Sequence, residues 1–282
     1  MNCIERILYY LQGEMIEPKA FGIFHIICLL LMFIIIYILY SIKGKHNDKQ
    51  LKFILGFYSI VALILEVLKQ LIWSFNYDSI TNSVTWDYEW YAFPFQLCTT
   101  PIYVCLFCLF LKKGKLRDSL LSYISFITIL GSISTMILPD SCLVSDILVN
   151  IHTMWLHLGS FVISVYLLIT KEVKLNIKNL VSANIVFIIF VLLSLVLNIS
   201  IYSSGILNGE TFNMFYISPY FISDLPVFNI IQENLPYLLF LIIYIWTIVL
   251  GSVLIFFIVS LIKRCGIVNK NEKGKEEIIK DY

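Results

Sequence analysis

The chain has 282 residues, of which 59% are hydrophobic and only 14% are charged. A soluble globular domain is nearer half apolar and a quarter charged, so this composition excludes an ordinary soluble protein and indicates a membrane protein with several spans. The formal net charge of +1 is less informative than the distribution of charge along the chain. The seven cysteines form no CxxC pair, and no His or Cys cluster has metal-ligand spacing, so we expect no metal site.

The N-terminal segment, residues 1–19, differs from the apolar runs that follow it. It carries several charged residues, and the first apolar run is too long for the h-region of a signal peptide. Its apolar residues recur at helical spacing: Ile4, Ile7, Leu8, Leu11 and Met15. This spacing predicts a short amphipathic helix that lies at the membrane interface.

Seven apolar runs approach or exceed the roughly 20 residues that a helix needs to cross the hydrocarbon. They cover residues 20–42, 51–75, 91–111, 119–138, 147–170, 180–202 and 235–262. Only helices satisfy their own backbone hydrogen bonds in lipid at these lengths, so the predicted fold class is an all-α bundle of seven transmembrane helices. The predicted organisation is an interfacial segment (1–19), a seven-helix transmembrane domain (20–262) and a polar, disordered tail (263–282).

Basic residues divide the connecting segments into two classes. Apart from Arg6, Lys19 and Lys69, every Lys and Arg lies between the first and second, third and fourth, or fifth and sixth runs or their edges, or in the C-terminal tail. Cytoplasmic segments are enriched in these residues, so we expect the N-terminus outside and the C-terminus in the cytoplasm. Scarce alanine and abundant Ile, Lys and Asn suggest an AT-rich bacterial genome. The expected location is therefore the bacterial plasma membrane, as a multi-pass protein.

Polar side chains within the apolar runs share one depth. With the predicted orientation, the following residues all fall in the outer half of the bilayer: His25, Glu66, Lys69, Gln70, Gln96, Cys98, Thr99, Thr100, His152, His157 and Asn198. An ionisable residue in mid-membrane costs about 2.5–3.5 kcal/mol on insertion scales. Glu66, Lys69 and Gln70 lie on one helix face. They form either a structural Glu–Lys pair or one wall of a polar cavity open to the outside.

The third run contains an unusual polar stretch, FPFQLCTTP. Pro101 cannot donate a hydrogen bond to the carbonyl of Leu97, so we expect it to kink the helix beside Cys98. The Cys98 thiol is either a packing residue or a nucleophile activated by a nearby base. At a rise of 1.5 Å per residue, the depths of Cys98 and His157 differ by about 5 Å. A Cys98–His157 pair is therefore one hypothesis for this region.

The long segment 203–234 joins the last two runs and carries few charges. It includes the strongly aromatic stretch FNMFYISPYF. This stretch is interpreted either as an aromatic belt at the membrane interface or as a lid over the outer cavity.

Six short motifs follow one another in a specific order from about residue 20 to 260: FGIFHIICLL, FPFQLC, LPD, HLGSFVISVYLL, NMFYIS and LPYLL. Together they resemble the YwaF family of bacterial integral membrane proteins, which is related to the eukaryotic transmembrane protein 164 family. Pro94, Cys98 and His157 match the residues of the family motifs. Gln96 stands where the family usually has His, so it is not expected to transfer protons at neutral pH.

The resemblance implies a seven-helix fold and a lipid acyltransferase that carries the acyl group on Cys98, with His157 as the essential histidine. The outer location of these residues disfavours coenzyme A, which is cytoplasmic, so we expect a phospholipid donor and transacylation. The supporting or binding residues of this hypothesis are Gln96, Thr99, Thr100, His25, Glu66, Lys69, Gln70, His152, Asn213 and Tyr216.

A second hypothesis is a non-catalytic transporter or sensor with a polar intramembrane cavity. Glu66, Lys69, Gln70 and the histidines would then bind a solute or protons. The two hypotheses differ in their dependence on Cys98, which transport would not require. The expected partners are membrane phospholipids, with no nucleic acid and no cofactor. The sequence gives no signal for an oligomeric state.

Overall fold

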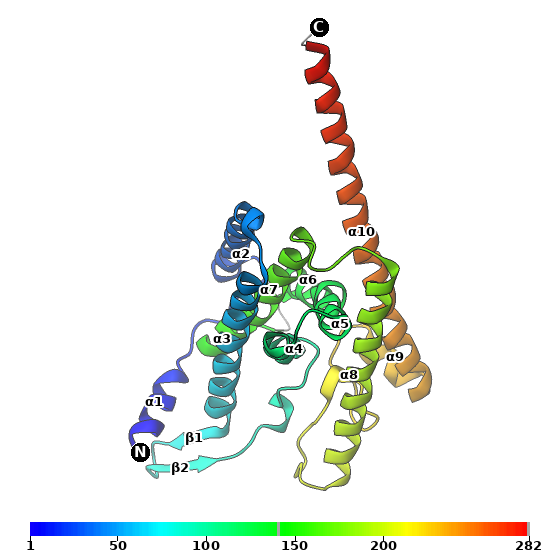
Figure 1. Ribbon diagram of the computed structural model, residues 1–282. Helices are drawn as coiled ribbons and strands as arrows, with labels where there is room; N and C mark the ends of the chain where they lie inside the picture. Colours follow the sequence, from blue (N-terminus) through cyan, green and yellow to red (C-terminus); the bar gives the residue numbers. More distant parts are fainter. Residues whose placement is uncertain (140–141, 281–282) are drawn as a thin grey trace.

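The computed structural model describes residues 1–139 and 142–280, with side chains up to residue 265. Figure 1 shows a mainly helical chain with a small β-hairpin. Its helices are α1 (Cys3–Leu11), α2 (Ile23–Ser41), α3 (Asp48–Ser74), α4 (Thr100–Phe110), α5 (Lys115–Tyr123), α6 (Ile129–Ile137), α7 (Ile147–Ile169), α8 (Ile177–Ser203), α9 (Phe228–Asn234) and α10 (Tyr237–Lys280). The strands β1 (Phe75–Asp78) and β2 (Ser83–Trp86) are antiparallel, with Phe75 opposite Trp86.

Six helical stretches of the described chain are long and apolar enough to cross a membrane. They are α2, α3, the stretch Lys115–Ile137, α7, α8 and residues Tyr237–Cys265 of α10. The third of these joins α5 to α6 through a π-helical turn, Ile124–Thr128. These stretches match six of the seven predicted runs within a few residues. The chain is therefore a helical membrane protein with several spans.

The third predicted run folds differently from the prediction. Helix α4 has only 11 residues, about 16 Å at 1.5 Å per residue, which is too short to cross the hydrocarbon alone. Pro101 lies in the first turn of α4, where its missing N–H has no helical partner to lose. The predicted kink at Pro101 is therefore wrong, because this proline begins a helix. The preceding residues form a short 3₁₀ helix, Trp90–Ala92, and a series of turns.

Side-chain contacts bring distant connections together at one end of the bundle, which we call the Arg117 end. The Arg117 guanidinium lies 2.6 Å from the Asp48 carboxylate and joins the start of α5 to the start of α3. His46 Nε2 lies 2.8 Å from Glu172, which follows α7. The segments that precede α3 and α5 and follow α7 thus meet at the same end.

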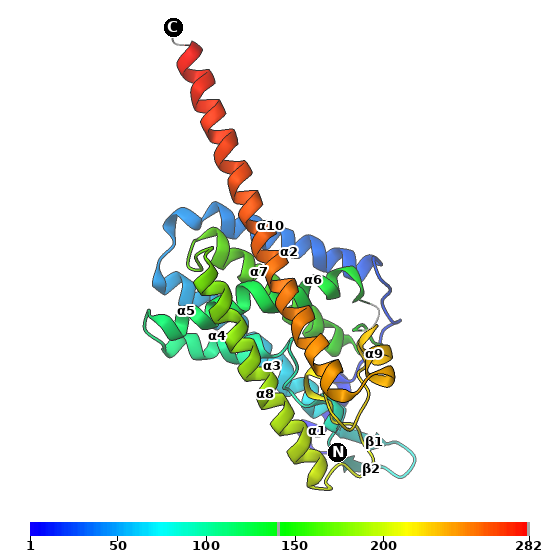
Figure 2. The same ribbon diagram turned by 90° about the vertical axis from the view of Figure 1, so that its right-hand side faces the viewer.

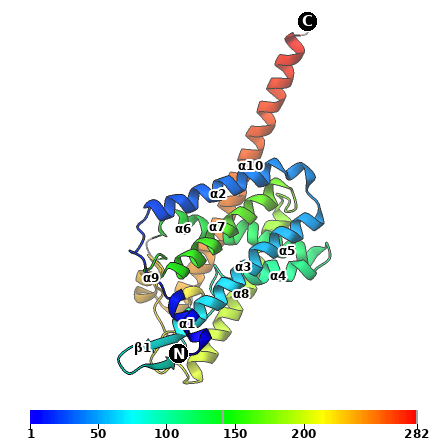
Figure 3. The ribbon, with the colours of Figure 1, turned by 90° about the vertical axis from the view of Figure 1, so that its left-hand side faces the viewer.

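The opposite end of the bundle carries α1 and the β-hairpin, and we call it the hairpin end (Figure 3). Gln12 Nε2 donates hydrogen bonds to the carbonyls of Ile72 and Phe75, at 2.7 and 2.6 Å. Leu8 of α1 is buried in the same cluster as Val149 of α7. The prediction of a short N-terminal helix is thus confirmed, and this helix packs on the ends of α3 and α7.

The core between the two ends is closely packed. Tyr58 of α3 and Ser160 of α7 share a hydrogen bond of 2.8 Å. The backbone of Gly159 approaches Tyr58 so closely that a Cβ at this position would lie 2.6 Å from the ring. Small residues commonly permit such approaches between membrane helices.

The first and last membrane-spanning helices, α2 and α10, are the least buried of the six. In each of these two helices, only 17% of the apolar stretch is buried inside the protein. The rest forms broad apolar surfaces of the kind that lipid covers. Helix α10 lies beside α8 (Figure 2). It continues to Lys280 and so includes most of segment 263–282, whose assignment to a separate disordered tail stays a prediction.

Candidate functional site

Cys98 is a half-buried free thiol in the turn immediately before α4. This turn is held by Thr99, whose Oγ1 donates to the carbonyl of Gln96 and accepts from the N–H of Gln96, both at 2.9 Å. Thr100 Oγ1 bonds to the carbonyl of Leu97 and to the Tyr123 hydroxyl, both at 2.7 Å. The two threonines therefore fix the backbone that presents the thiol.

The side chain of Gln96 pairs with a buried loop, residues 212–218. Its Nε2 donates to the carbonyl of Asn213 at 2.9 Å, and its Oε1 accepts from the N–H of Phe215 at 2.7 Å. Asn198 of α8 pairs in the same way with both backbone groups of Met214, at 3.0 and 2.8 Å. The loop forms no regular backbone ladder here, so two side-chain amides supply the hydrogen-bond partners that its buried backbone groups need.

The buried loop also has internal supports and an unusual backbone. Asn213 Oδ1 accepts from the N–H of Ser218 at 2.8 Å. Phe215 and Tyr216 both have left-handed backbone angles, with φ of 59° and 57°, a conformation that is uncommon outside glycine. The side chain of Phe215 is fully buried. This part of segment 203–234 packs inside the protein, which neither interpretation of its sequence anticipated.

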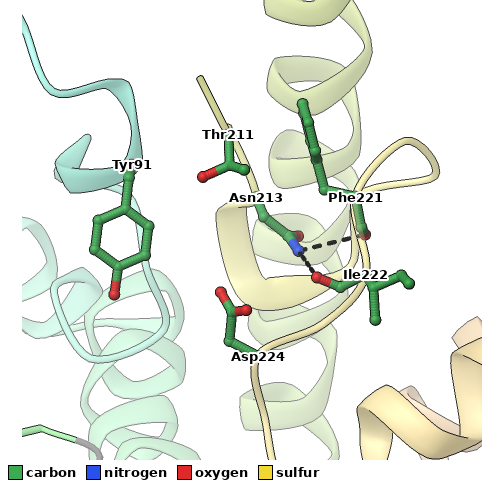
Figure 4. A pocket seen from close by; sticks show the side chains of 6 residues that line it. All are labelled: Tyr91, Thr211, Asn213, Phe221, Ile222 and Asp224. Atoms are coloured by element: carbon green, nitrogen blue, oxygen red, sulfur yellow. Dashed lines mark hydrogen bonds between the residues drawn. The ribbon is translucent and has the colours of Figure 1, made fainter. Parts of the chain in front are cut away.

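A pocket of about 430 Å³ lies beside the buried loop. Figure 4 shows Tyr91 on one side of it and Thr211, Asn213 and Asp224 on the other. The side chains of Tyr91 and Tyr216 are hydrogen-bonding partners. Both lie within electrostatic range of Cys98 and of Asp224. Tyr91 therefore lines the pocket and also lies within electrostatic range of the thiol.

Sequence reasoning missed Tyr91 and Asp224 as site residues. Asp224 is one of the few charged residues of segment 203–234, and that scarcity was the available signal. Tyr91 lies at the edge of an apolar run rich in aromatic residues, where one tyrosine carries no distinguishing pattern. Its importance comes from its contact with Tyr216, which is far away in the sequence.

A second polar group, the Glu66 network, connects α3 to α7. The Glu66 carboxylate lies 2.8 Å from Lys69 Nζ through Oε1 and 2.8 Å from His152 Nε2 through Oε2. Gln70 Nε2 donates to Glu66 at 2.8 Å and to the carbonyl of Ala92 at 2.5 Å. Glu66, Lys69 and His152 are all buried. The network therefore joins two helices to the 3₁₀ turn that leads toward Cys98.

The remaining two predicted histidines make other contacts. His157 Nδ1 lies 3.0 Å from Thr135 Oγ1 of α6. His25 is buried in α2, and its Nδ1 accepts a hydrogen bond from the N–H of Phe21 at 3.1 Å. Within the described chain, no hydrogen bond joins Cys98 to His157. The hypothesis of a Cys98–His157 pair is thus left without a hydrogen bond between the two side chains among the described residues.

The predicted site residues therefore fall into three groups. Around one turn and the buried loop lie Gln96, Cys98, Thr99, Thr100, Asn213 and Tyr216. The Glu66 network contains Glu66, Lys69, Gln70 and His152, and its charges reach Cys98 electrostatically. His25 and His157 are held elsewhere. No group of three His, Cys, Asp or Glu residues in the described chain could hold a metal ion.

Comparison with protein families gives a match over most of the chain. The model of the TMEM164 family matches residues 20–263, which include the described apolar spans up to the last two residues of the sixth, the Cys98 turn and the buried loop. No curated protein and no solved structure matches the chain.

Proposed function

Because the chain belongs to the TMEM164 family, we propose that it transfers acyl chains between membrane lipids through a thioester on Cys98. The observation that carries this proposal is the placement of the thiol. Cys98 sits on a turn fixed by Thr99, and Gln96 of that turn binds the backbone of Asn213, which lines the pocket of about 430 Å³. Tyr91 and Tyr216 lie within electrostatic range of the thiol. A cysteine that only packs would not need a turn held by two threonines and tyrosine hydroxyls within electrostatic range.

The proposed reaction has two steps. First, the Cys98 sulfur attacks the ester carbonyl of a phospholipid, so that a C–S bond forms and the ester C–O bond breaks. The thiol proton passes to the departing lipid oxygen. Second, the hydroxyl of an acceptor lipid attacks the thioester carbonyl, the C–S bond breaks, and the acceptor proton returns to sulfur. The ester energy is conserved throughout, so neither an oxidant nor a nucleotide is consumed.

Each neighbouring residue has a role in this proposal. His157 is assigned as the base, and the contact of its Nδ1 with Thr135 orients the ring. Contacts between a base and its nucleophile often tighten only when substrate binds. Gln96, Thr99 and Thr100 position the turn and the loop, because their polar atoms are engaged with backbone or with Tyr123. Tyr216 is the group we propose as donor to the developing oxyanion.

We further propose that the chain crosses the membrane seven times, with residues 90–110 as the third crossing. Helix α3 ends at the hairpin end and α5 begins at the Arg117 end, so the intervening chain has to pass through the bundle. Non-helical backbone is tolerated at membrane depth where protein surrounds it, and Ala92, Thr99 and Thr100 are buried.

The basic segments at the Arg117 end support a cytoplasmic location for that end in this proposal, with the N-terminus outside. The Cys98 site then faces the outer leaflet of the plasma membrane, where phospholipids are available and coenzyme A is not. The acyl donor in this proposal is therefore a phospholipid.

The Glu66 network favours a second candidate, a transporter or sensor. Buried ionisable residues in membrane proteins commonly mark ion or solute pathways. Here both carboxylate oxygens of Glu66 are already bound by Lys69, Gln70 and His152. A carboxylate held by three neighbouring side chains fits a structural support for the turn before Cys98 better than an exchanging site, so we prefer the acyltransferase.

The decisive experiment is intact-protein mass spectrometry of the full chain in phospholipid nanodiscs. We expect a mass gain of one acyl chain that hydroxylamine removes at neutral pH and that Cys98→Ser abolishes. Cys142→Ser is the matched control, because Cys142 lies within electrostatic range of Cys98 and should be dispensable. An adduct that persists in Cys98→Ser, or a wild-type chain that never forms one while solute uptake depends on Glu66, would refute the proposal.

A further inference from the structure

A second pocket, of about 600 Å³, lies at the hairpin end and has no part in the proposed acyl transfer. It is formed by α1 and the residues after it, by the last turn of α3, by β1 and by Asp146 just before α7. Figure 3 shows α1 lying beside the ends of α3 and β1. Because Gln12 ties α1 to the backbone of Ile72 and Phe75, the wall that α1 contributes is fixed.

The charged residues that line this pocket are all acidic. Glu14 and Asp146 both line it, and no Lys or Arg does. None of the ion pairs of the described residues involves either carboxylate. Gln12 uses its N–H groups on backbone carbonyls, so the atom that its amide retains for a ligand is an acceptor oxygen. The pocket therefore offers negative charge and hydrogen-bond acceptors.

The backbone places the two acidic residues, exposed Glu14 and half-buried Asp146, side by side. Glu14 and Asp146 are directly opposite each other in an antiparallel bridge. The hydrogen bonds on either side of it run from Met15 N to Ser145 O at 2.8 Å and from Ile147 N to Gly13 O at 3.1 Å. Like charges directly opposite on paired strands destabilise the pairing. A bound cation would relieve that repulsion.

The other walls of the pocket are aromatic. Tyr9, Tyr10 and Trp73 line it, and Tyr9 and Tyr10 meet edge to face with ring centroids 6.0 Å apart. The ring of Trp73 already faces a cation, because Lys69 Nζ lies 5.6 Å from its centroid. Glu66 pairs with that ammonium at 2.8 Å, so Lys69 adds little net repulsion to the pocket. Aromatic rings with nearby carboxylates are the usual environment for alkylammonium ligands.

We propose that this pocket binds an organic ammonium cation, held by the carboxylates of Glu14 and Asp146 and by the rings of Tyr9, Tyr10 and Trp73. A metal cation would not use the aromatic walls, and a neutral ligand would leave the two carboxylates unpaired. A free amine and the ammonium headgroup of a lipid present the same chemistry to these groups. This site is separate from Cys98 and does not depend on the proposed acyl transfer.

The first arm of the test uses the full chain in nanodiscs of phosphatidylglycerol, which has no ammonium group, and tetramethylammonium as the probe. Binding is measured by calorimetry and by the shift in Tm, against sodium chloride at equal ionic strength. We expect tetramethylammonium to raise Tm in the wild type. Glu14→Gln and Asp146→Asn should each weaken the affinity by about fivefold or more. Glu17→Gln, an exposed change nearby, should leave it unchanged.

The unliganded variants give an independent reading of folding. Glu14→Gln should fold and should have an unliganded Tm no lower than that of the wild type, because it removes one of two opposed charges. Cys98→Ser should bind tetramethylammonium normally, which separates this proposal from acyl transfer. Equal shifts with sodium and tetramethylammonium, or undiminished binding in both acidic-site variants, would overturn the ammonium site.

A second arm distinguishes the two sources of the ligand. Phosphatidylcholine added to the nanodiscs should compete with tetramethylammonium if the pocket takes a lipid headgroup, and the apparent affinity then falls in the wild type alone. An unchanged affinity assigns the pocket to a free amine. Both results support the ammonium site, whereas a failure to bind the probe in phosphatidylglycerol nanodiscs would exclude it.

Discussion

Glu66 is the residue on which the buried charge of the bundle converges. Its carboxylate contacts Lys69, Gln70 and His152, which are themselves buried or half-buried. Loss of the carboxylate would leave these groups without a partner away from water. A buried ion pair adds little net stability over an apolar pair of similar shape, but the loss of one partner is costly. The network therefore fixes α3, α7 and the turn before Cys98 relative to one another.

Glu66→Gln tests whether the network supports the fold, because it keeps the shape of the side chain and removes its charge. Lys69 is then left without its counter-ion, which costs about 3–5 kcal/mol, and we expect Tm in detergent to fall by several degrees. Adding Lys69→Met should restore part of the loss, because it removes the unpaired cation. Glu17→Gln, at an exposed position, controls for the loss of a carboxylate. An unchanged Tm in Glu66→Gln would show that the network does not support the fold.

The sequence predicted the Glu66 residues as a group because they recur on one helix face within five positions. It did not predict their partner on α7, since His152 follows 86 positions later and the contact depends on how the helices pack. The same limit applies to Tyr91 and Tyr216. Local spacing reveals chemistry within an element, whereas the pairing of elements has to come from the fold.

The buried loop is the element that most affects the site. Residues 212–218 have little regular structure beyond a 3₁₀ turn, yet they lie inside the protein, held by Gln96 from one side and Asn198 from the other. Buried backbone groups without partners cost about 1–3 kcal/mol each. The two amides remove most of this cost, and they thereby fix Tyr216 next to the Cys98 turn.

Gln96→Leu should release this loop, since it leaves the carbonyl of Asn213 and the N–H of Phe215 without their partners. We expect faster hydrogen exchange in residues 212–218, measured by mass spectrometry, and a lower Tm. Gln96→Glu retains an acceptor for Phe215 but has no donor for Asn213, so its effect should be intermediate. Exchange that stays as slow in Gln96→Leu as in the wild type would mean that the loop is held by other contacts.

Two glycines in helices should respond in opposite ways to the same substitution. A Cβ at Gly159 would lie 2.6 Å from the Tyr58 ring, whereas a Cβ at Gly131 would meet nothing within 4 Å. Overpacking typically costs about 1–3 kcal/mol, and Ala is favoured over Gly in a helix interior by about 0.8–1 kcal/mol. We expect Gly159→Ala to lower Tm and Gly131→Ala to raise it slightly.

Adding Tyr58→Leu to Gly159→Ala should restore at least part of the lost Tm, because leucine lacks the ring atoms that the new methyl group meets. The single variant Tyr58→Leu provides the baseline for this comparison. A decrease in Tm of equal size in Gly131→Ala and Gly159→Ala would contradict the close contact between α3 and α7.

Element boundaries differ in how far hydropathy can locate them. The long apolar helices were predicted within a few residues, because composition and length alone determine a membrane span. Helix α4 was not, because a proline in an apolar run is compatible with a kink or with a helix start. In the structure, the contacts of Thr99 and the hydrogen bond from the Tyr103 hydroxyl to the carbonyl of Pro94 hold the turn from which α4 begins. The β-hairpin also went unpredicted.

At the scale of the whole molecule, the number of membrane crossings decides which face presents the Cys98 site. Six long helices alone would return the chain to the side on which it starts. With residues 90–110 as a further crossing, the two termini lie on opposite sides. Seven crossings agree with the concentration of basic residues at the Arg117 end and in the C-terminal segment.

The chain carries its own reporters of this topology. Cys3 near the N-terminus and Cys265 near the end of the α10 span are exposed, whereas the other cysteines are buried or half-buried. A membrane-impermeant maleimide added to intact spheroplasts should label Cys3, and Cys265 should react only after permeabilisation. Cys3→Ser and Cys265→Ser identify each signal. Labelling of both cysteines from the same side would mean an even number of crossings. Residues 90–110 would then enter and leave the membrane at one face, and the proposed outer-leaflet location of Cys98 would no longer follow from the charge distribution.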